Sequence, residues 1–228
     1  PTEYPARSHD VTYTDASARL GPRSATNPRS ITASSADSPP MSDRPADYGC
    51  TSGASTREAH EILIEMVGRD VVERAIGKLD PATREAYESA TSITWIPCEA
   101  VEAVYGAIAE EASLGLEDLQ ADVMRAGVDR TLRTLWRILL RFTSDKALVA
   151  RTPMFYRKVF NTGALTSAMK GEGRAEIEMT GWPEITEFHL RGLMVGIQCV
   201  LERAGRRNVV MRPRRTRGGA IIDARWGW

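Results

Sequence analysis

Residues 184 to 204 constrain the fold most, because their helical pattern leaves little polar surface. When the segment is turned by about 100° per residue, its strongly polar residues fall in one narrow stripe. These residues are Glu187, Arg191, Gln198 and Glu202. We therefore expect a long buried helix, which ends at Gly205 in the C′ position. A helix of this kind needs other elements packed on most of its sides.

His189 and two glycines occupy the other sides of this helix. His189 falls opposite the polar stripe, and Gly192 and Gly196 flank it at a spacing that indicates close approach of another backbone. Three explanations of a buried histidine stay open: a hydrogen-bonded core residue, a haem or metal ligand, or part of a ligand pocket. No second His, Cys or acidic residue stands at ligand spacing from His189, so the pattern predicts no metal site.

The rest of the chain changes from helical to alternating patterns along its length. Apolar residues spaced by threes and fours predict helices within 55–112 and a long helix over 117–142. The first helix is expected to begin at the capping box Ser55-Thr56-Arg57-Glu58. Alternation predicts strands at 175–179, 208–212 and 220–226. The fold class is therefore α+β, with a helical N-terminal half followed by a small antiparallel sheet with one long buried helix.

The first 54 residues differ from the rest in composition. They hold 22 Ser, Thr and Pro residues and show no apolar periodicity, so they cannot bury enough surface to offset their ordering entropy. We expect residues 1–54 to be a disordered tail, or an untranslated leader if Met41 is the true start. Residues 55–228 are expected to form a single α+β domain.

Charge, cysteine content and motifs exclude several classes of protein. The formal net charge is zero, and the three Cys residues form no disulfide framework or metal-ligand spacing. No apolar run reaches the length of a membrane span or resembles a signal peptide, which favours a cytoplasmic protein. The nucleophile elbow, the Walker loop, the dinucleotide fingerprint and the His-Glu-x-x-His motif do not occur. The sequence therefore predicts a non-enzymatic protein without cofactor or metal.

The segment 203–217 is the strongest local concentration of charge. It holds seven Arg residues, and six of them could grip phosphate: Arg206, Arg207, Arg212, Arg214, Arg215 and Arg217. Aromatic residues for base stacking are not interleaved with them, and the preceding half of the chain is acidic. Solvation of a hairpin tip, or contact with a protein partner or with the chain's own acidic half, explains the segment as well. Polyanion or nucleic-acid binding is therefore the alternative function.

Scattered positions from about Trp95 to the C-terminus form a pattern that resembles a known family. They are Trp182-Pro183, Phe188, Arg191-Gly192, Gly196, Gly205, Asn208-Val209, and Ile222 with Trp226. The stretch resembles a family of paralogues in myxobacteria, a domain of unknown function. More distantly, it is similar to the superfamily of nitric-oxide-sensing haem domains, four-vinyl-reductase domains and vesicle-tethering subunits.

The superfamily resemblance implies a pocket for a small or lipidic molecule between helices and sheet. The Tyr-x-Ser-x-Arg signature of the haem domains does not occur in this chain, and neither does the C-terminal cysteine cluster of the four-vinyl-reductase domains. Haem and metal are therefore not expected, whereas an apolar pocket is.

These observations favour a non-enzymatic cytoplasmic ligand-sensing or adaptor domain. Its apolar pocket is expected between helices and sheet, lined by Trp136, Phe155, Phe160, Phe188 and His189. The expected partners are an apolar small molecule and either a second copy of the chain or another protein. Nucleic acid is the less favoured partner.

Overall fold

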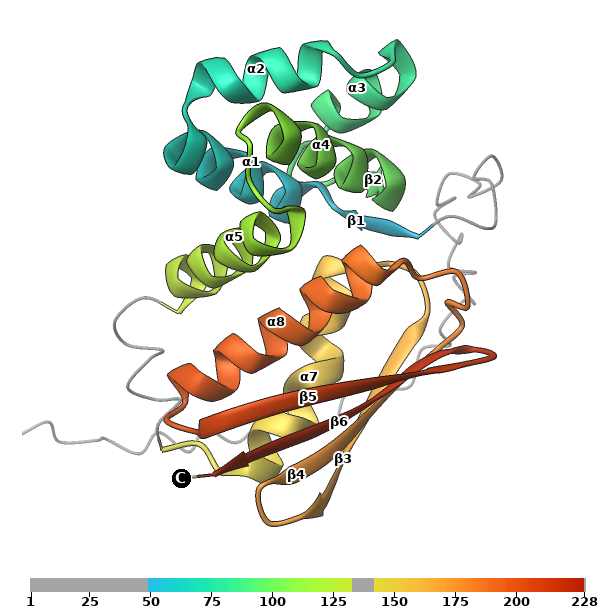
Figure 1. The fold of residues 1–228 in the computed structure, drawn as a ribbon. Helices are drawn as coiled ribbons and strands as arrows, with labels where there is room; N and C mark the ends of the chain where they lie inside the picture. The colour runs from blue at the N-terminus through green and yellow to red at the C-terminus, as the bar shows by residue number, and fades with distance from the viewer. Residues whose placement is uncertain (1–48, 133–141, 228) are drawn as a thin grey trace, which may run out of the picture. The chain divides into compact units, whose positions relative to one another are not determined.

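The computed structural model describes residues 49–132 and 142–227, and these residues have the expected α+β fold (Figure 1). The first part contains β1 (Cys50–Ser52), α1 (Gly53–Val67), α2 (Arg69–Gly77), α3 (Pro81–Glu88), β2 (Trp95–Pro97), α4 (Cys98–Glu111) and α5 (Leu116–Thr131). The second part contains α7 (Asp145–Val159), β3 (Ala164–Gly171), β4 (Arg174–Thr180), α8 (Glu187–Arg203), β5 (Arg207–Thr216) and β6 (Gly219–Gly227). The predicted order of helices, strand, long helix and strands is confirmed.

Helix α1 begins before the capping box that the sequence indicated. Its N-cap is Ser52, whose hydroxyl accepts the amide of Ser55 at 3.3 Å. The start predicted at Ser55 is wrong, because strand β1 ends at Ser52 and the helix begins at the next residue, Gly53. Strand β1 pairs antiparallel with β2. No local pattern predicts this contact, because the two segments lie far apart in the sequence. The tail was predicted over 1–54, but residues 49–54 belong to the folded part, and residues 1–48 lie outside the described residues.

Helix α5 covers only the first part of the long helix predicted over 117–142. It ends at Thr131, and residues 133–141 lie outside the described residues. Arg130, near the end of α5, makes ion pairs with Glu61 and Glu65 of α1.

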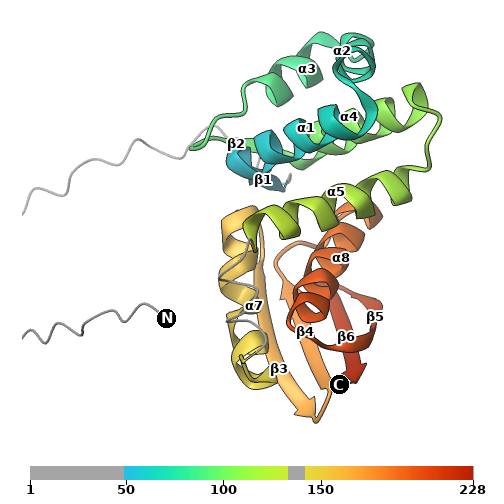
Figure 2. The same cartoon turned by 90° about the vertical axis from the view of Figure 1, so that its left-hand side faces the viewer.

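The main sheet has the strand order β3-β4-β6-β5, and every pairing is antiparallel. In β4, Ala175, Ile177 and Met179 are buried while Glu178 is exposed, which confirms the alternation predicted for 175–179. Helices α7 and α8 cover the buried face side by side (Figure 2). Strand β3 was not predicted.

Helix α7 contains Pro153 in its interior. Proline has no amide hydrogen, so the carbonyl of Val149, four residues earlier, loses its helical donor. The hydroxyl of Ser167 in β3 donates to that carbonyl oxygen at 2.6 Å. The strand thus supplies the hydrogen bond that the proline removes.

Helix α8 matches the buried helix predicted over 184–204. It is capped by the hydroxyl of Thr186, and the chain turns away at Gly205 with φ of 90°. A Cβ atom on Gly196 would lie 3.2 Å from Cε of Met124, and one on Gly192 would lie 3.0 Å from Nε2 of Gln120. The two glycines therefore contact side chains of helix α5, and the close approach of another backbone that their spacing predicted is not observed.

Buried apolar side chains form two cores. The helical core includes Ile62, Leu63, Val72, Val104, Ile108, Leu119 and Val123. The sheet core includes Ile177, Met179, Trp182, Leu190, Leu193, Leu201 and Ile222. No helix within the described ranges has both the length and the hydropathy needed to cross a membrane.

Candidate ligand-binding site

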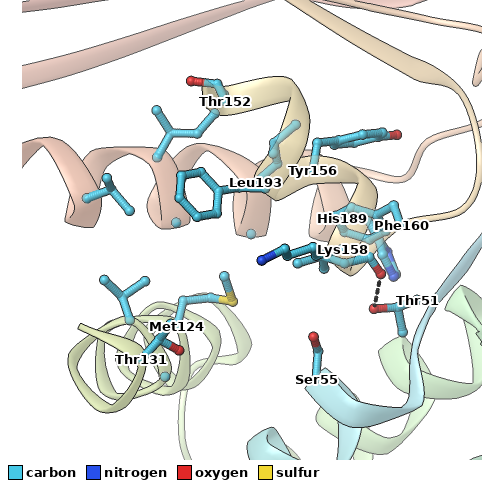
Figure 3. A pocket seen from close by; sticks show the side chains of 18 of the residues that line it. Thr51, Ser55, Met124, Thr131, Thr152, Tyr156, Lys158, Phe160, His189 and Leu193 are labelled. Carbon is cyan, nitrogen blue, oxygen red and sulfur yellow. Dashed lines mark hydrogen bonds between the residues drawn. The ribbon is translucent and has the colours of Figure 1, made fainter. Parts of the chain in front are cut away.

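An apolar pocket lies where the helical core and the sheet core meet (Figure 3). Its cavity is about 440 Å³, within the range of small-molecule sites in proteins. Helices α1, α4, α5, α7 and α8 contribute to its wall, together with strands β4 and β6. The pocket therefore lies between helices and sheet.

Four of the five residues predicted for the pocket line this cavity. Phe155 is at the C-terminal part of α7, Phe160 follows the end of that helix, and Phe188 and His189 lie in the first turn of α8. Phe155 is 42% exposed, which places it at the edge. The fifth residue, Trp136, lies outside the described residues. Their role in binding a ligand remains a prediction.

The adjacent residues Phe188 and His189 face different cores. Phe188 packs on Tyr105 of α4, with ring centroids 5.2 Å apart. His189 is 4% exposed, and its ring centroid lies 6.1 Å from Phe160 and 6.0 Å from Trp182. Since the Phe188 ring is also 5.1 Å away, three aromatic rings surround the imidazole. Figure 3 shows His189 beside Phe160 at one end of the pocket.

The hydrogen bonds around Thr186 fix the tautomer of His189. The hydroxyl of Thr186 has one hydrogen, which it donates to Oε2 of Glu102 at 2.7 Å. Its oxygen lies 3.1 Å from Nδ1 of His189 and can only accept there, so Nδ1 carries the proton. The other ring nitrogen, Nε2, is then an acceptor. It is buried and has no hydrogen-bond partner among the described residues.

Burial keeps this imidazole neutral. Desolvation lowers the pKa of His189 from 6.5 to about 4, because the charged form loses its hydration among apolar groups. The Glu102 carboxylate, 3.6 Å from Nδ1, does not offset that loss. At neutral pH the imidazole of His189 is therefore uncharged.

Gln120 of α5 was not identified from the sequence. Its Nε2 donates to the main-chain oxygen of Phe188 at 2.7 Å, while its Oε1 is buried without a hydrogen-bond partner in the described part of the chain. A signal was available, because Gln120 stands three and four residues before Val123 and Met124, within the apolar stripe of its helix. A polar residue in such a stripe indicates a specific contact.

One cation and one carboxylate are the charged groups among the described lining residues. Figure 3 shows Lys158 of α7 extending into the space between α7 and the Met124 side of α5. The carboxylate belongs to Glu58 of α1. These two opposite charges balance within the described part of the lining. Within the described ranges, no group of three His, Cys, Asp or Glu residues is placed to hold a metal ion.

The arginine-rich segment is not exposed throughout. Arg206, which we predicted to contact a polyanion, is 2% exposed. Its guanidinium donates to Asp145, to the main-chain oxygen of Ala204 and to that of Thr143. The prediction for Arg206 is wrong, because its buried side chain forms hydrogen bonds that join α7 to the end of α8.

Arg207, Arg212, Arg214 and Arg215 lie on β5, at the edge of the sheet, and Arg217 lies in the turn that follows it. Arg215 donates to the main-chain oxygen of Ile185 and pairs with Glu187. The exposed members of the set are Arg207, Arg212, Arg214, Arg215 and Arg217. Charged residues and Pro213 on an edge strand discourage pairing with a strand of another molecule, which explains this composition without a polyanion.

Solved structures with the same fold are haem NO-binding (H-NOX) domains. The Fe(II) unliganded H-NOX protein from K. algicida aligns with a TM-score of 0.58 at 10% identity, over 78% of this chain and 97% of that one. A mutant of the H-NOX from T. tengcongensis aligns with a TM-score of 0.54 at 12% identity, over 77% and 96%. An oxygen-binding H-NOX domain related to soluble guanylate cyclases aligns with 0.51 at 12% identity, over 77% and 91%. At these identities the likeness establishes the fold.

No protein-family model matches the chain, and no curated protein matches it at a significant level. The resemblance to a myxobacterial family is therefore unsupported, whereas the likeness to the haem domains is supported at the level of fold.

Proposed function

We propose that this domain is a non-enzymatic sensor or adaptor that binds an apolar small molecule in the pocket between the two cores. The observation that carries the proposal is the cavity of about 440 Å³, which side chains of both cores line. A cavity of this size between apolar walls suits a small apolar molecule. A ligand that contacts α5, α7 and α8 together would couple the helical core to the sheet core.

The described lining does not fit haem as a whole. A neutral imidazole with a free nitrogen suits an axial ligand, but haem also carries two propionate groups that need cations. The lining offers one ammonium, of Lys158, and the carboxylate of Glu58 offsets its charge. The aromatic rings around His189 favour an uncharged ligand group instead. We therefore derive no haem chemistry for this chain.

Binding of a neutral fluorescent dye, N-phenyl-1-naphthylamine, tests the proposal. The cavity wall includes the half-buried Val200 of α8, and Val200→Phe fills part of the cavity. We expect this variant to weaken dye binding about tenfold. Val67→Phe is the matched control, because Val67 is also half-buried but lies at the end of α1 outside the lining, and it should bind like the wild type.

Equal dye affinity in both variants would contradict the proposal, because it would place the bound dye elsewhere. Native mass spectrometry of the purified protein should then be combined with an absorption spectrum after incubation with haemin. We expect a co-purifying small molecule and no Soret band that depends on His189. A His189-dependent Soret band would instead indicate a haem protein.

A further inference from the structure

We propose that the ligand of this pocket is an amphipathic monoanion, a mostly apolar molecule with one carboxylate group that the ammonium of Lys158 binds. This inference rests on the proposed function and specifies its ligand class. Lys158 is an exposed residue of α7 that lines the cavity, and Figure 3 shows its side chain extending into the space towards Met124 of α5. A ligand in the cavity can therefore reach the ammonium.

The ammonium of Lys158 is available for such a contact. Within the described ranges it forms no ion pair or hydrogen bond, whereas Lys170 of β3 pairs with Glu176 at 2.8 Å. The carboxylate of Glu58 balances the charge of the lining, but no ion pair joins it to Lys158. An anionic group of a ligand would therefore not have to displace a partner that the described residues supply.

Two hydroxyl groups add hydrogen-bond donors to the wall of the same cavity. They belong to Ser55 of α1 and Thr131 of α5, and neither forms a hydrogen bond with another described residue. The hydroxyls of Thr51 and Thr152, by contrast, already donate to main-chain oxygens of α7. A carboxylate has two acceptor oxygens, so it can accept from an ammonium and from a hydroxyl at the same time. The free polar groups of the lining therefore suit a carboxylate.

The rest of the lining limits the ligand to one charged group. Lys158 is the single cation among the described lining residues, so a second carboxylate would lie against apolar side chains without a counter-charge. Apolar residues of both cores form most of the wall, and the aromatic rings around His189 belong to the same pocket. The apolar part of the ligand is expected to fill this space.

Three probes with the same eight-carbon chain test the inference. At pH 7 octanoate is an anion, octylamine is a cation, and octan-1-ol is neutral. Displacement of N-phenyl-1-naphthylamine from the full chain measures the affinity of each. Both ions lose hydration when they enter the pocket, but only octanoate meets an available cation there, so we expect it to bind more tightly than octylamine. Octan-1-ol measures the contribution of the apolar wall alone.

Variants on α7 link this preference to one ammonium group. Lys158→Met removes the charge and keeps an unbranched apolar side chain, so it should weaken octanoate binding about fivefold and leave octan-1-ol binding unchanged. Lys158→Arg retains a cation and should bind octanoate nearly as well as the wild type. Lys146→Met is the matched control, because Lys146 is also exposed and lies on α7 but is not part of the lining. It should bind all three probes like the wild type.

The possible failures are distinguishable. If none of the three probes displaces the dye, the proposed function itself is wrong. If octan-1-ol displaces it but octanoate binds equally to the wild type and to Lys158→Met, the pocket binds apolar molecules and the assignment of a carboxylate ligand is overturned. Equal losses of octanoate binding in Lys158→Met and Lys146→Met would also overturn it, because they would indicate a general effect of charge. If octylamine binds best and loses this advantage in Glu58→Gln, the carboxylate of Glu58 selects a cationic ligand instead.

Discussion

The helical part and the sheet part of this domain are held together in different ways. The helical core is apolar, and its ion pairs lie at the surface, as between Glu111 and the side chains of Arg74 and Lys78. The sheet part contains an internal ion pair between Arg206 and Asp145, whose side chains are 0% and 11% exposed. Trp226 also donates its indole N–H to Asp145 at 2.9 Å. The described ion pairs of the helical part therefore lie at its surface, whereas the sheet part contains one inside.

The largest effect is expected where that internal pair is broken. Arg206→Leu leaves Asp145 without its cation and removes the donors to Ala204 and Thr143. Removing one partner of a buried pair costs roughly 3–5 kcal/mol. Urea denaturation should show this loss in the free energy of unfolding.

Arg207→Leu provides the control, because Arg207 is the next residue and is exposed. Its free energy of unfolding should change by less than about 0.5 kcal/mol. Equal losses in the two variants would mean that the sheet part does not depend on the Arg206 contact.

A pH series is expected to give the next largest effect. His189 has a pKa of about 4 in the folded state and about 6.5 when unfolded, so only the unfolded state takes up its proton between these values. The contribution of His189 to the free energy of unfolding should be constant above pH 6.5 and should fall by about 3 kcal/mol as the pH decreases towards 4. His189→Gln should remove this part of the pH dependence.

His60 of α1 gives the comparison within the helical part. Desolvation and the nearby Arg69 also lower its pKa, but its ring is only partly buried. His60→Gln should therefore remove a smaller part of the pH dependence. A larger effect at His60 than at His189 would contradict the placement of the buried imidazole in the sheet part.

A larger side chain between α5 and α8 should lower the free energy of unfolding by an intermediate amount. Gly196→Leu forces a side chain against Met124, whose Cε would lie 3.2 Å from the new Cβ, and overpacking of this kind costs about 1–3 kcal/mol. Gly106→Leu in α4 is the control, because no atom lies within 4 Å of a Cβ at that position. A midpoint of urea denaturation that is unchanged in Gly196→Leu would show that this face of α8 is not closely packed.

The smallest effect should have the opposite sign. Gly106→Ala places a better helix former in the interior of α4, where the new methyl group meets no neighbour. The free energy of unfolding should rise by about 0.5–1 kcal/mol. A loss of stability would mean that the backbone of α4 is more tightly surrounded than its open Cβ position indicates.

Features with a local cause could be predicted from the sequence. The polar stripe and the glycine at 205 were sufficient for helix α8, and the alternation at 175–179 was sufficient for β4. Strand β3 was missed because only Leu165 is buried in it, so an edge strand with small residues shows little alternation. The pairing of β1 with β2 depends on segments more than 40 residues apart, which no local pattern records.

The pocket could be predicted in part. The periodicity placed His189 on the buried side of its helix, and the structure brings Phe155, Phe160 and Phe188 to the same cavity. The cavity itself depends on the space that side chains from several elements leave unfilled, which is a property of packing. Likewise, nothing local distinguishes Arg206 from Arg207, because the position at which β5 begins decides which of them is buried.

The hydrogen bond from Ser167 to Val149 limits the order in which two positions can change during evolution. Pro153 is tolerated inside α7 because the hydroxyl of Ser167 donates a hydrogen bond to the Val149 carbonyl, which the proline leaves without a helical donor. If Ser167 changed first, that carbonyl would lose its donor, whereas replacement of Pro153 by alanine would restore the helical one. Lineages of this domain should therefore lose the proline before the serine, and the serine should be free to vary wherever position 153 is not proline.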